Sequence, residues 1–209
     1  MFTRRMISFA VVATLAFSAL ALAQDKKPDA DKAPAGAGGM DPGAMKAMAD
    51  AATPGAQHKA LEAMSGDFTY VSGFRMDPSQ DWMKSEGKYN GEMQLGGRYL
   101  FVSVTGPMMG MTYEGRGAIG YDNTLGKYVL AWLDNMGTGI MRCEGTSADD
   151  GQTLTFTGEM MDPMSKKNLP FKEEFKVTGP DTFTLSFWSP SMSDGKMFES
   201  MKIEYTRAK

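Results

Sequence analysis

Between Asp67 and Arg207 the chain alternates hydrophobic and polar residues in short runs, and residues typical of turns separate these runs. The first run, "DFTYVSGFRM", repeats its aromatic residues at even spacing, at Phe68, Tyr70 and Phe74. Successive side chains of a strand point to opposite faces, so this alternation predicts a strand with one face toward a core. About ten such runs follow one another, and together they predict an all-β domain.

Short turns separate the predicted strands. The segments 149–151, 178–180 and 193–195 suit hairpins between sequential neighbours. No stretch between the runs is long enough for a crossover helix, which disfavours a parallel sheet. We therefore predict a single antiparallel up-and-down β-barrel of about 8–10 strands, which leaves no exposed edge. A β-sandwich is the alternative.

A short helix is predicted before the strands. Thr53 can act as its N-cap and Pro54 suits its first turn, and the helix ends at Ser65-Gly66. The barrel domain then spans residues 54–209. The preceding segment, residues 24–53, is rich in Ala, Gly, Pro, Asp and Lys, and we interpret it as a disordered spacer with a marginal helix over "PGAMKAMADAA".

Residues 1–23 have the pattern of a signal peptide. Arg4 and Arg5 precede an apolar run that ends in Ala21-Leu22-Ala23, a pattern that signal peptidase accepts, so we predict cleavage after Ala23. The alternative is a retained N-terminal anchor. Cleavage would leave no segment for stable membrane insertion and would place the protein in the periplasm or the medium.

Charge argues against two classes of partner. The chain has 22 basic and 25 acidic residues, and loss of Arg4 and Arg5 leaves 20 basic residues and a net charge of −5. Nucleic acids and anionic lipid surfaces attract clusters of Lys and Arg. We therefore expect neither as a partner; the sequence does not fix the oligomeric state.

Residues for nucleophilic or metal chemistry are scarce. The only histidine, His58, precedes the strands, and the only cysteine, Cys143, lies in an alternating run where it suits packing. One histidine and one cysteine cannot supply a usual zinc site, and the strands offer no histidine to haem. We expect no catalytic residue, no metal and no cofactor; an enzyme of unknown chemistry is the third interpretation of the function.

Methionine is over-represented, with 20 in 209 residues. It gathers in "PMMGM" (residues 107–111) and "EMMDPM" (residues 159–164). Clustered thioethers can bind Cu(I), whereas methionine also fills irregular cores and lines adaptable apolar pockets. We favour packing or pocket lining over copper.

Several segments occur in a characteristic order: "HKALEAMSGDF", "LGGRYL", "MGMTYEGRGAIGYDN", "YVLAWLDNMGTG", "LTFTGEMMDP" and "IEYTR". With them the chain resembles the bacterial domain-of-unknown-function family numbered 1579, whose members are similar to lipocalin-like calycin barrels. The resemblance implies a barrel and no particular reaction. Such barrels often carry Gly-x-Trp on the first strand beneath an arginine of the last strand. Here Gly66-Asp67-Phe68 and Arg207 match, so the resemblance implies that Arg207 covers Phe68 at the barrel floor.

A barrel of this size can enclose one small apolar ligand. We expect non-catalytic binding of a small hydrophobic ligand; the alternative is an envelope protein-interaction or structural module with a filled core. The candidate ligand-binding residues are Tyr99, Tyr113, Arg116, Tyr121, Trp132, Asp134 and Arg142.

The run "KYVLAWLD" decides how two of these candidates point. One face of this predicted strand carries Tyr128, Leu130, Trp132 and Asp134, and the other carries Val129, Ala131 and Leu133. The second face is wholly apolar and is the better candidate for the core, which would turn Trp132 outward. If Trp132 instead points inward, Asp134 lies at the barrel mouth. Before this strand, Asp122 is predicted to start a turn in which Gly126 takes a positive φ.

Overall fold

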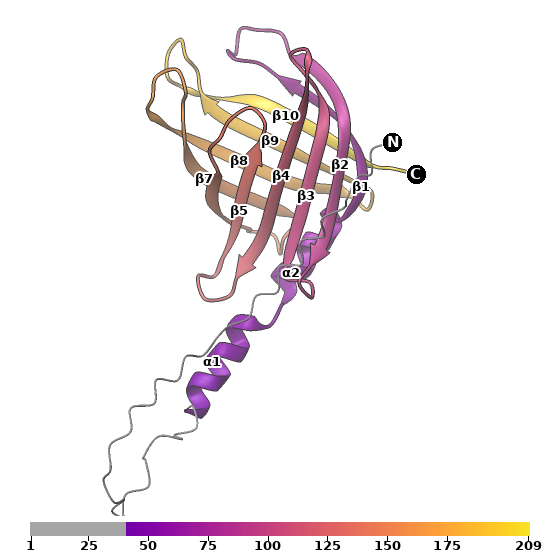
Figure 1. Ribbon diagram of the computed structural model, residues 1–209, viewed down its shortest axis with the longest axis vertical. Coiled ribbons are helices and arrows are strands. Elements are labelled where there is room, and N and C mark those ends of the chain that lie inside the picture. Colours follow the sequence, from indigo (N-terminus) through magenta and orange to yellow (C-terminus); the bar gives the residue numbers. More distant parts are fainter. Residues whose placement is uncertain (1–40) are drawn as a thin grey trace, which may run out of the picture. The chain divides into compact units, whose positions relative to one another are not determined.

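The computed structural model describes residues 41–209, so the predicted signal peptide and residues 24–40 of the predicted spacer lie outside the described residues. In the described part, ten antiparallel strands form one closed barrel (Figure 1), and each strand pairs with its neighbours in sequence while β1 closes against β10. The strands are β1 (Gly66–Phe74), β2 (Met83–Gln94), β3 (Tyr99–Met108), β4 (Met111–Asp122), β5 (Lys127–Asp134), β6 (Met141–Thr146), β7 (Thr153–Met161), β8 (Asn168–Gly179), β9 (Thr182–Pro190) and β10 (Met197–Arg207). The predicted up-and-down barrel is confirmed, and the alternative of a sandwich is wrong.

One end of the barrel is covered by α2 (Ala56–Ala60) and the 3₁₀ helix η1 (Leu61–Met64). The Tyr89 hydroxyl donates to the Met64 carbonyl at 2.8 Å. A side chain at Gly91 would overlap the Met64 carbonyl, so this glycine lets η1 approach the wall. We call this end, with the strand halves next to it, the closed half. The open half is the opposite end, whose loops are residues 75–82, 109–110, 135–140, 162–167 and 191–196.

Arg207 covers the floor of the closed half. Its guanidinium carbon lies 4.4 Å from the centre of the Phe68 ring, its Nη1 donates to the Ser65 carbonyl at 2.8 Å and its Nε pairs with Asp181 at 3.0 Å. The β1–β10 register places Phe68 directly opposite Arg207. The arrangement implied by the family resemblance is therefore confirmed.

The N-terminal helices differ from their prediction at the start of the second helix, where α2 begins at Ala56 and Pro54 lies before it rather than in its first turn. The helix α1 (Pro42–Ala52) coincides with the marginal helix predicted in the spacer, and all of its side chains are exposed. The prediction of Thr53 as the next N-cap is wrong, because the Thr53 hydroxyl donates back to the Ala49 carbonyl at 2.7 Å. Gly55 occupies the N-cap position of α2 instead. None of the described helices combines the length and the apolar character needed to cross a membrane.

Strand β5 turns its aromatic face inward. Tyr128 and Leu130 are 2% and 1% exposed, whereas Leu133 is 47% exposed. The expectation that Val129, Ala131 and Leu133 form the core is therefore wrong. The reason lies on the neighbouring strand, where Gly117 stands opposite Trp132 and Gly115 stands opposite Asp134.

The turn between β4 and β5 agrees with its prediction. The Asp122 carboxylate accepts hydrogen bonds from the amides of Thr124 and Leu125 at 2.8 and 3.0 Å. Gly126 has a φ of 67°, in the left-handed region that favours glycine. Asp122 is thus a turn residue, as expected.

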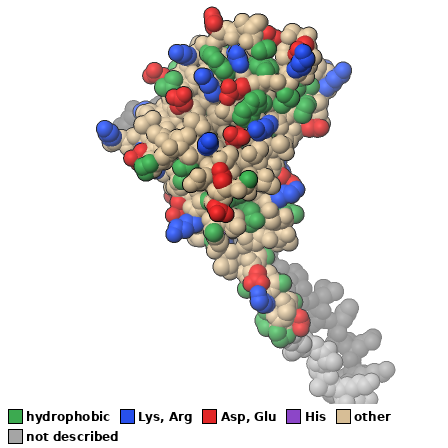
Figure 2. Space-filling model, turned by 180° about the vertical axis from the view of Figure 1, so that it is seen from behind, with side chains coloured by type: hydrophobic (Ala, Val, Ile, Leu, Met, Phe, Trp, Pro, Cys, Tyr) green, Lys and Arg blue, Asp and Glu red, His purple; other side chains and the backbone are tan. Residues whose placement is uncertain are grey.

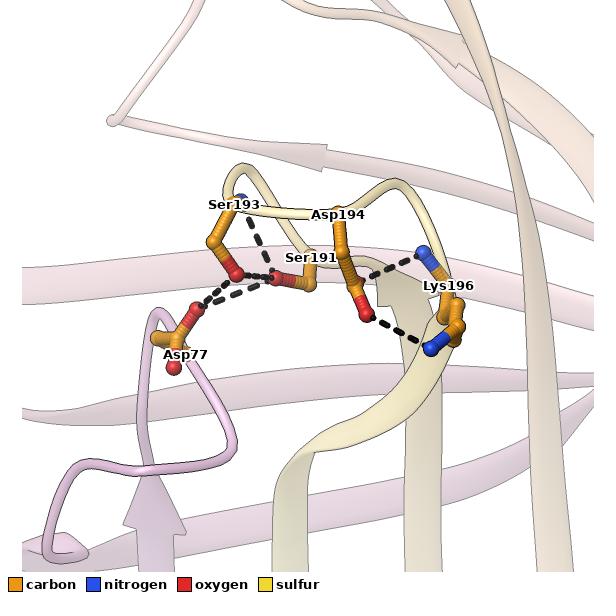
Figure 3. Close-up of polar contacts among 5 residues, drawn as sticks. All are labelled: Asp77, Ser191, Ser193, Asp194 and Lys196. Carbon is orange, nitrogen blue, oxygen red and sulfur yellow. Dashed lines mark hydrogen bonds and ion pairs between the residues drawn. The ribbon is translucent and has the colours of Figure 1, made fainter.

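Two loops of the open half are joined across the β1–β10 seam (Figure 3). Asp77, in the β1–β2 loop, accepts hydrogen bonds from the hydroxyls of Ser191 and Ser193 at 3.0 and 2.8 Å. Its other oxygen accepts from Ser79. Hydrogen bonds from Ser79, then from Ser193 and Ser191, hold the pKa of Asp77 far below its usual value. This side of the rim is therefore held by a network of neutral donors around one carboxylate.

Candidate functional site

Three side chains meet on the inner wall of the open half. Asp134 Oδ2 lies 3.2 Å from the Tyr113 hydroxyl and 3.2 Å from Trp132 Nε1, and both of these groups donate to it. Asp134 Oδ1 accepts from the Met136 amide at 2.9 Å. Trp132 Nε1 also lies 3.2 Å from the Tyr113 hydroxyl. The carboxylate is thus held by neutral donors and fixes the rings of Tyr113 and Trp132.

The local sequence explains why the indole fits inside. Cβ atoms added at Gly115 and Gly117 would overlap the ring of Trp132, so these two glycines leave the space that the ring occupies. In "YEGRG" the two glycines, Gly115 and Gly117, are two residues apart and so share the inward side of β4. The indole therefore lies flat against a backbone wall without side chains.

A second carboxyl group, Glu173, lies deeper in the barrel. It sits between Phe171 and Phe175 on the inward face of β8, and all three are buried. Glu173 is 6% exposed, and its Oε2 has no hydrogen-bond partner among the described residues. Burial raises the pKa of Glu173 to about 8. A buried polar atom without a partner is unfavourable, so this oxygen calls for an explanation.

Other titratable groups of the barrel interior are held in their neutral forms. Burial, followed by the charge of Glu173, raises the pKa of the Cys143 thiol to about 12. Burial also raises the pKa of Tyr205 well above its usual value, with smaller contributions from the charges of Tyr89 and Glu173. For Tyr113, burial and then the charge of Asp134 raise the pKa above its usual range. At neutral pH the thiol and the phenols are therefore protonated and are poor nucleophiles or bases.

The inward side chains change in exposure along the barrel. In the closed half, Phe68, Tyr89 and Phe183 are 1–5% exposed. In the open half, inward side chains such as Trp132, Asp134 and Phe187 are only half-buried. Solvent therefore reaches the interior from the open end and not from the floor.

The rim of the open half is rich in methionine. Apolar side chains lie among the loops at the upper end of the barrel in Figure 2. Nine exposed methionines lie in these loops or at the adjoining strand ends: Met76, Met83, Met109, Met111, Met136, Met161, Met164, Met192 and Met197. Methionine side chains are flexible and apolar and can adapt to ligands of different shape.

The predicted site residues divide into two groups. Four point inward: Tyr113, Trp132 and Asp134 form the hydrogen-bonded group of the open half, and Tyr121 packs at the closed end, where its ring lies 5.0 Å from Tyr128. The other three, Tyr99, Arg116 and Arg142, are exposed on the outer wall. The structure therefore does not bring the seven residues together.

Two open grooves lie on the outer wall of the described barrel. One, of about 420 Å³, lies beside the end of α1 and is lined by Tyr99, Arg98 and Arg142 among others. The other, of about 510 Å³, lies over β5, β6 and β7 and contains the ion pair Lys127–Glu144. Neither groove is an enclosed chamber inside the barrel.

Glu173 was not among the predicted site residues. Its signal was present in "PFKEEFKV", where the residue shares one face of an alternating strand with Phe171 and Phe175. A carboxylate flanked by two phenylalanines on one strand face is a candidate for an interior polar group. The only histidine, His58, is buried, and its Nδ1 accepts from the Gly55 amide at 3.0 Å. Within residues 41–209, no group of three or more His, Cys, Asp or Glu side chains could hold a metal ion.

The fold and the polar interior define a class, the closed ten-stranded antiparallel β-barrels. Within it, the chain belongs to the family described as "Protein of unknown function (DUF1579)", whose model matches residues 53–207. The crystal structure of Rv2717c from M. tuberculosis is similar in fold, with a TM-score of 0.54 at 12% identity, over 75% of this chain and 100% of that one. A Nostoc punctiforme protein of unknown function from the DUF3598 family matches at 8% identity over 73% of this chain and 99% of that one, with a TM-score of only 0.21. No curated protein matches the chain.

Proposed function

We propose that this protein binds one small, largely apolar ligand in the open half of its barrel and does not transform it. The observation that carries the proposal is the buried Glu173 oxygen that lacks a hydrogen-bond partner in the described part of the chain. A bound ligand that supplies a donor would remove the cost of leaving this atom unpaired.

The lining of the open half suits such a ligand. Phe187 and Trp132 provide aromatic surface, and Phe187 stacks on Phe171 with ring centres 5.2 Å apart. Binding sites of this kind are mostly apolar, with a few polar groups that orient the ligand. Here Asp134 and Glu173 would orient it, and the methionine rim would close over its apolar part.

The absence of catalysis is supported by the state of the interior groups. The raised pKa values of Cys143 and Tyr113 keep these groups protonated near neutral pH. His58 lies in the helical segment of the closed half, at the end of the barrel opposite Asp134. A nucleophile with an adjacent base, as acyl or phosphoryl transfer needs, is therefore not assembled among the described residues.

A second function, an interaction module with a filled core, is favoured by one observation. Both grooves described above lie on the outer wall, and the closed half is filled by side chains. A ligand would therefore need the flexible rim and half-buried side chains to move apart. For either function we propose export to the periplasm or the medium, on the strength of the signal-peptide pattern in residues 1–23.

Extraction of the native protein tests the proposal. The protein is purified without detergent, denatured in organic solvent, and the extract is examined by mass spectrometry. We expect a small apolar compound in roughly stoichiometric amount, less of it from Trp132→Phe, and an unchanged amount from Trp188→Phe, because Trp188 lies on the outer wall beneath Lys172. An empty extract from the wild-type protein, together with no binding of added apolar compounds, would favour the interaction module.

A further inference from the structure

We infer that the ligand carries a protonated amine, which Glu173 receives inside the barrel. The inference rests on the proposed function and names the chemical class of the ligand for that same site. It is drawn from the charges, the unpaired oxygen and the aromatic surface of the interior.

The barrel interior carries acidic groups without basic partners among the described residues. Asp134 and Glu173 both lie on inward positions of their strands. Among the described residues, five ion pairs are formed, and neither carboxyl group belongs to any of them. A cation would therefore find two acidic groups that no side-chain charge already neutralises.

The basic side chains of the strands lie elsewhere. The exposed ones are Lys84, Lys88, Arg116, Lys127, Arg142, Lys176 and Lys202. Lys172 reaches over the outer ring of Trp188, and Arg207 is engaged at the floor. No basic side chain of the described strands is thus directed at Glu173, which is why its Oε2 is left without a partner.

Aromatic faces complete the site for a cation. Trp132 and Tyr113 lie on the inner wall beside Asp134. Cations are attracted to the faces of aromatic rings, and this attraction grows when water is excluded. An anionic ligand would meet the charge of Asp134 and that of the ionised fraction of Glu173. A neutral donor would satisfy Oε2 but would lack the charge-assisted hydrogen bond that an ammonium group forms with the ionised carboxylate.

Three probes of the same chain length separate these cases: n-decylamine, n-decanol and n-decanoate. Binding to the full-length protein is measured by calorimetry near pH 8, where Glu173 is about half ionised and the amine is protonated. We expect n-decylamine to bind about tenfold or more tightly than n-decanol, and n-decanoate to bind most weakly. The preference for one charge over another is measured on the wild-type protein, so this comparison does not depend on the folding of a variant.

Substitutions then locate the selectivity. Glu173→Gln should reduce the affinity for n-decylamine about tenfold and leave that for n-decanol nearly unchanged, and Asp134→Asn should act in the same direction. Glu174→Gln is the matched control, because this neighbour faces Lys172 at 3.1 Å rather than the interior. Circular dichroism confirms that each variant is folded before binding is measured.

The outcomes separate the inference from the proposed function. If n-decanol or n-decanoate binds as tightly as n-decylamine, or Glu173→Gln binds the amine like the wild-type protein, the barrel binds apolar ligands but the inference of a cation is wrong. If none of the three probes binds and the extract of the native protein is empty, the proposed function is wrong, and the inference that rests on it is wrong as well.

Discussion

The closed and open halves of the barrel are built from the same ten strands, but different side chains fill them. In the closed half, the rings of Phe183 and Tyr205 stack 4.1 Å apart, and Phe68 packs edge-on to Phe183 at 5.0 Å. In the open half, the inner wall carries the half-buried carboxylate of Asp134 and is bordered by flexible methionines. One end of the fold thus provides stability, and the other is free to carry polar groups that would be costly in a sealed core.

The largest expected effect is the difference in stability loss between a substitution in the closed half and one at the rim of the open half. Phe68→Ala should lower the free energy of unfolding by about 3–5 kcal/mol, because it removes a side chain that is 2% exposed and leaves a cavity. Met109→Ala, at a rim residue that is 70% exposed, should change it by less than about 0.5 kcal/mol. Urea denaturation of both variants measures the difference. Equal losses would contradict the division into two halves.

The second prediction concerns the pH dependence of stability. Burial raises the pKa of Glu173 from 4.5 to about 8, so between these values the folded protein binds a proton that the unfolded chain has lost. Stability should therefore fall as pH rises through this window, by up to about 1.4 kcal/mol per pH unit. Glu173→Gln should remove this slope and be more stable than the wild-type protein above pH 8.

Thermal denaturation at intervals from pH 5 to pH 9 measures this slope. Glu174→Gln again serves as the control and should retain the wild-type profile. If the stability of Glu173→Gln and that of the wild-type protein depend on pH in the same way, the pKa of Glu173 is not raised, and the account of Glu173 as an unpaired buried group is wrong.

A smaller loss is expected from the arginine of the floor. Arg207→Ala should lower the free energy of unfolding by about 1–3 kcal/mol, because the Ser65 carbonyl loses its donor and the Phe68 ring loses its cover. Denaturation together with amide exchange at η1 and β10 measures it. Glu204→Ala, from an exposed position of the same strand, is the control and should be nearly neutral.

The smallest effect on stability is expected from oxidation of the rim. Dilute peroxide should oxidise Met109, Met164 and Met192, each 66–70% exposed, well before Met64, which is 2% exposed. The unfolding midpoint should barely change, while binding of n-decanol should weaken because sulfoxides are polar. Peptide mass spectrometry gives the order of oxidation. Unaltered binding after complete oxidation of the rim would exclude it from the site.

The sequence was sufficient to predict the barrel and part of its interior. Period-two alternation marks strands wherever it occurs, and the turn signals at Asp122 and Gly126 are local, so these predictions are confirmed. The orientation of Trp132 was not predicted, because it depends on Gly115 and Gly117 of the adjacent strand rather than on its own run. The hydrophobic pattern of a single strand predicts that its more apolar face points to the core. In β5 the less apolar face, which carries the indole and the carboxylate, is the inner one.

A second limit of the sequence prediction concerns three predicted site residues that lie on the outer wall, Tyr99, Arg116 and Arg142. The chemistry of an aromatic or charged residue on a strand does not tell which way it points. Alternation decides this, and these three residues fall on the outer face. Glu173 falls on the inner face by the same rule. Its lack of a partner could not be read from the sequence, because it depends on which groups the other strands direct toward it.

Nuclear magnetic resonance of the three tryptophan indoles tests the central claim most directly. Trp132 lies inside the open half, whereas Trp82 packs on the outer wall against Arg75, and Trp188 lies beneath Lys172. Titration with the n-decyl probe of highest affinity should shift the Trp132 indole resonance and leave the other two in place. A saturating probe that shifts Trp82 or Trp188 while Trp132 stays unchanged would place the ligand on the outer wall and contradict the account.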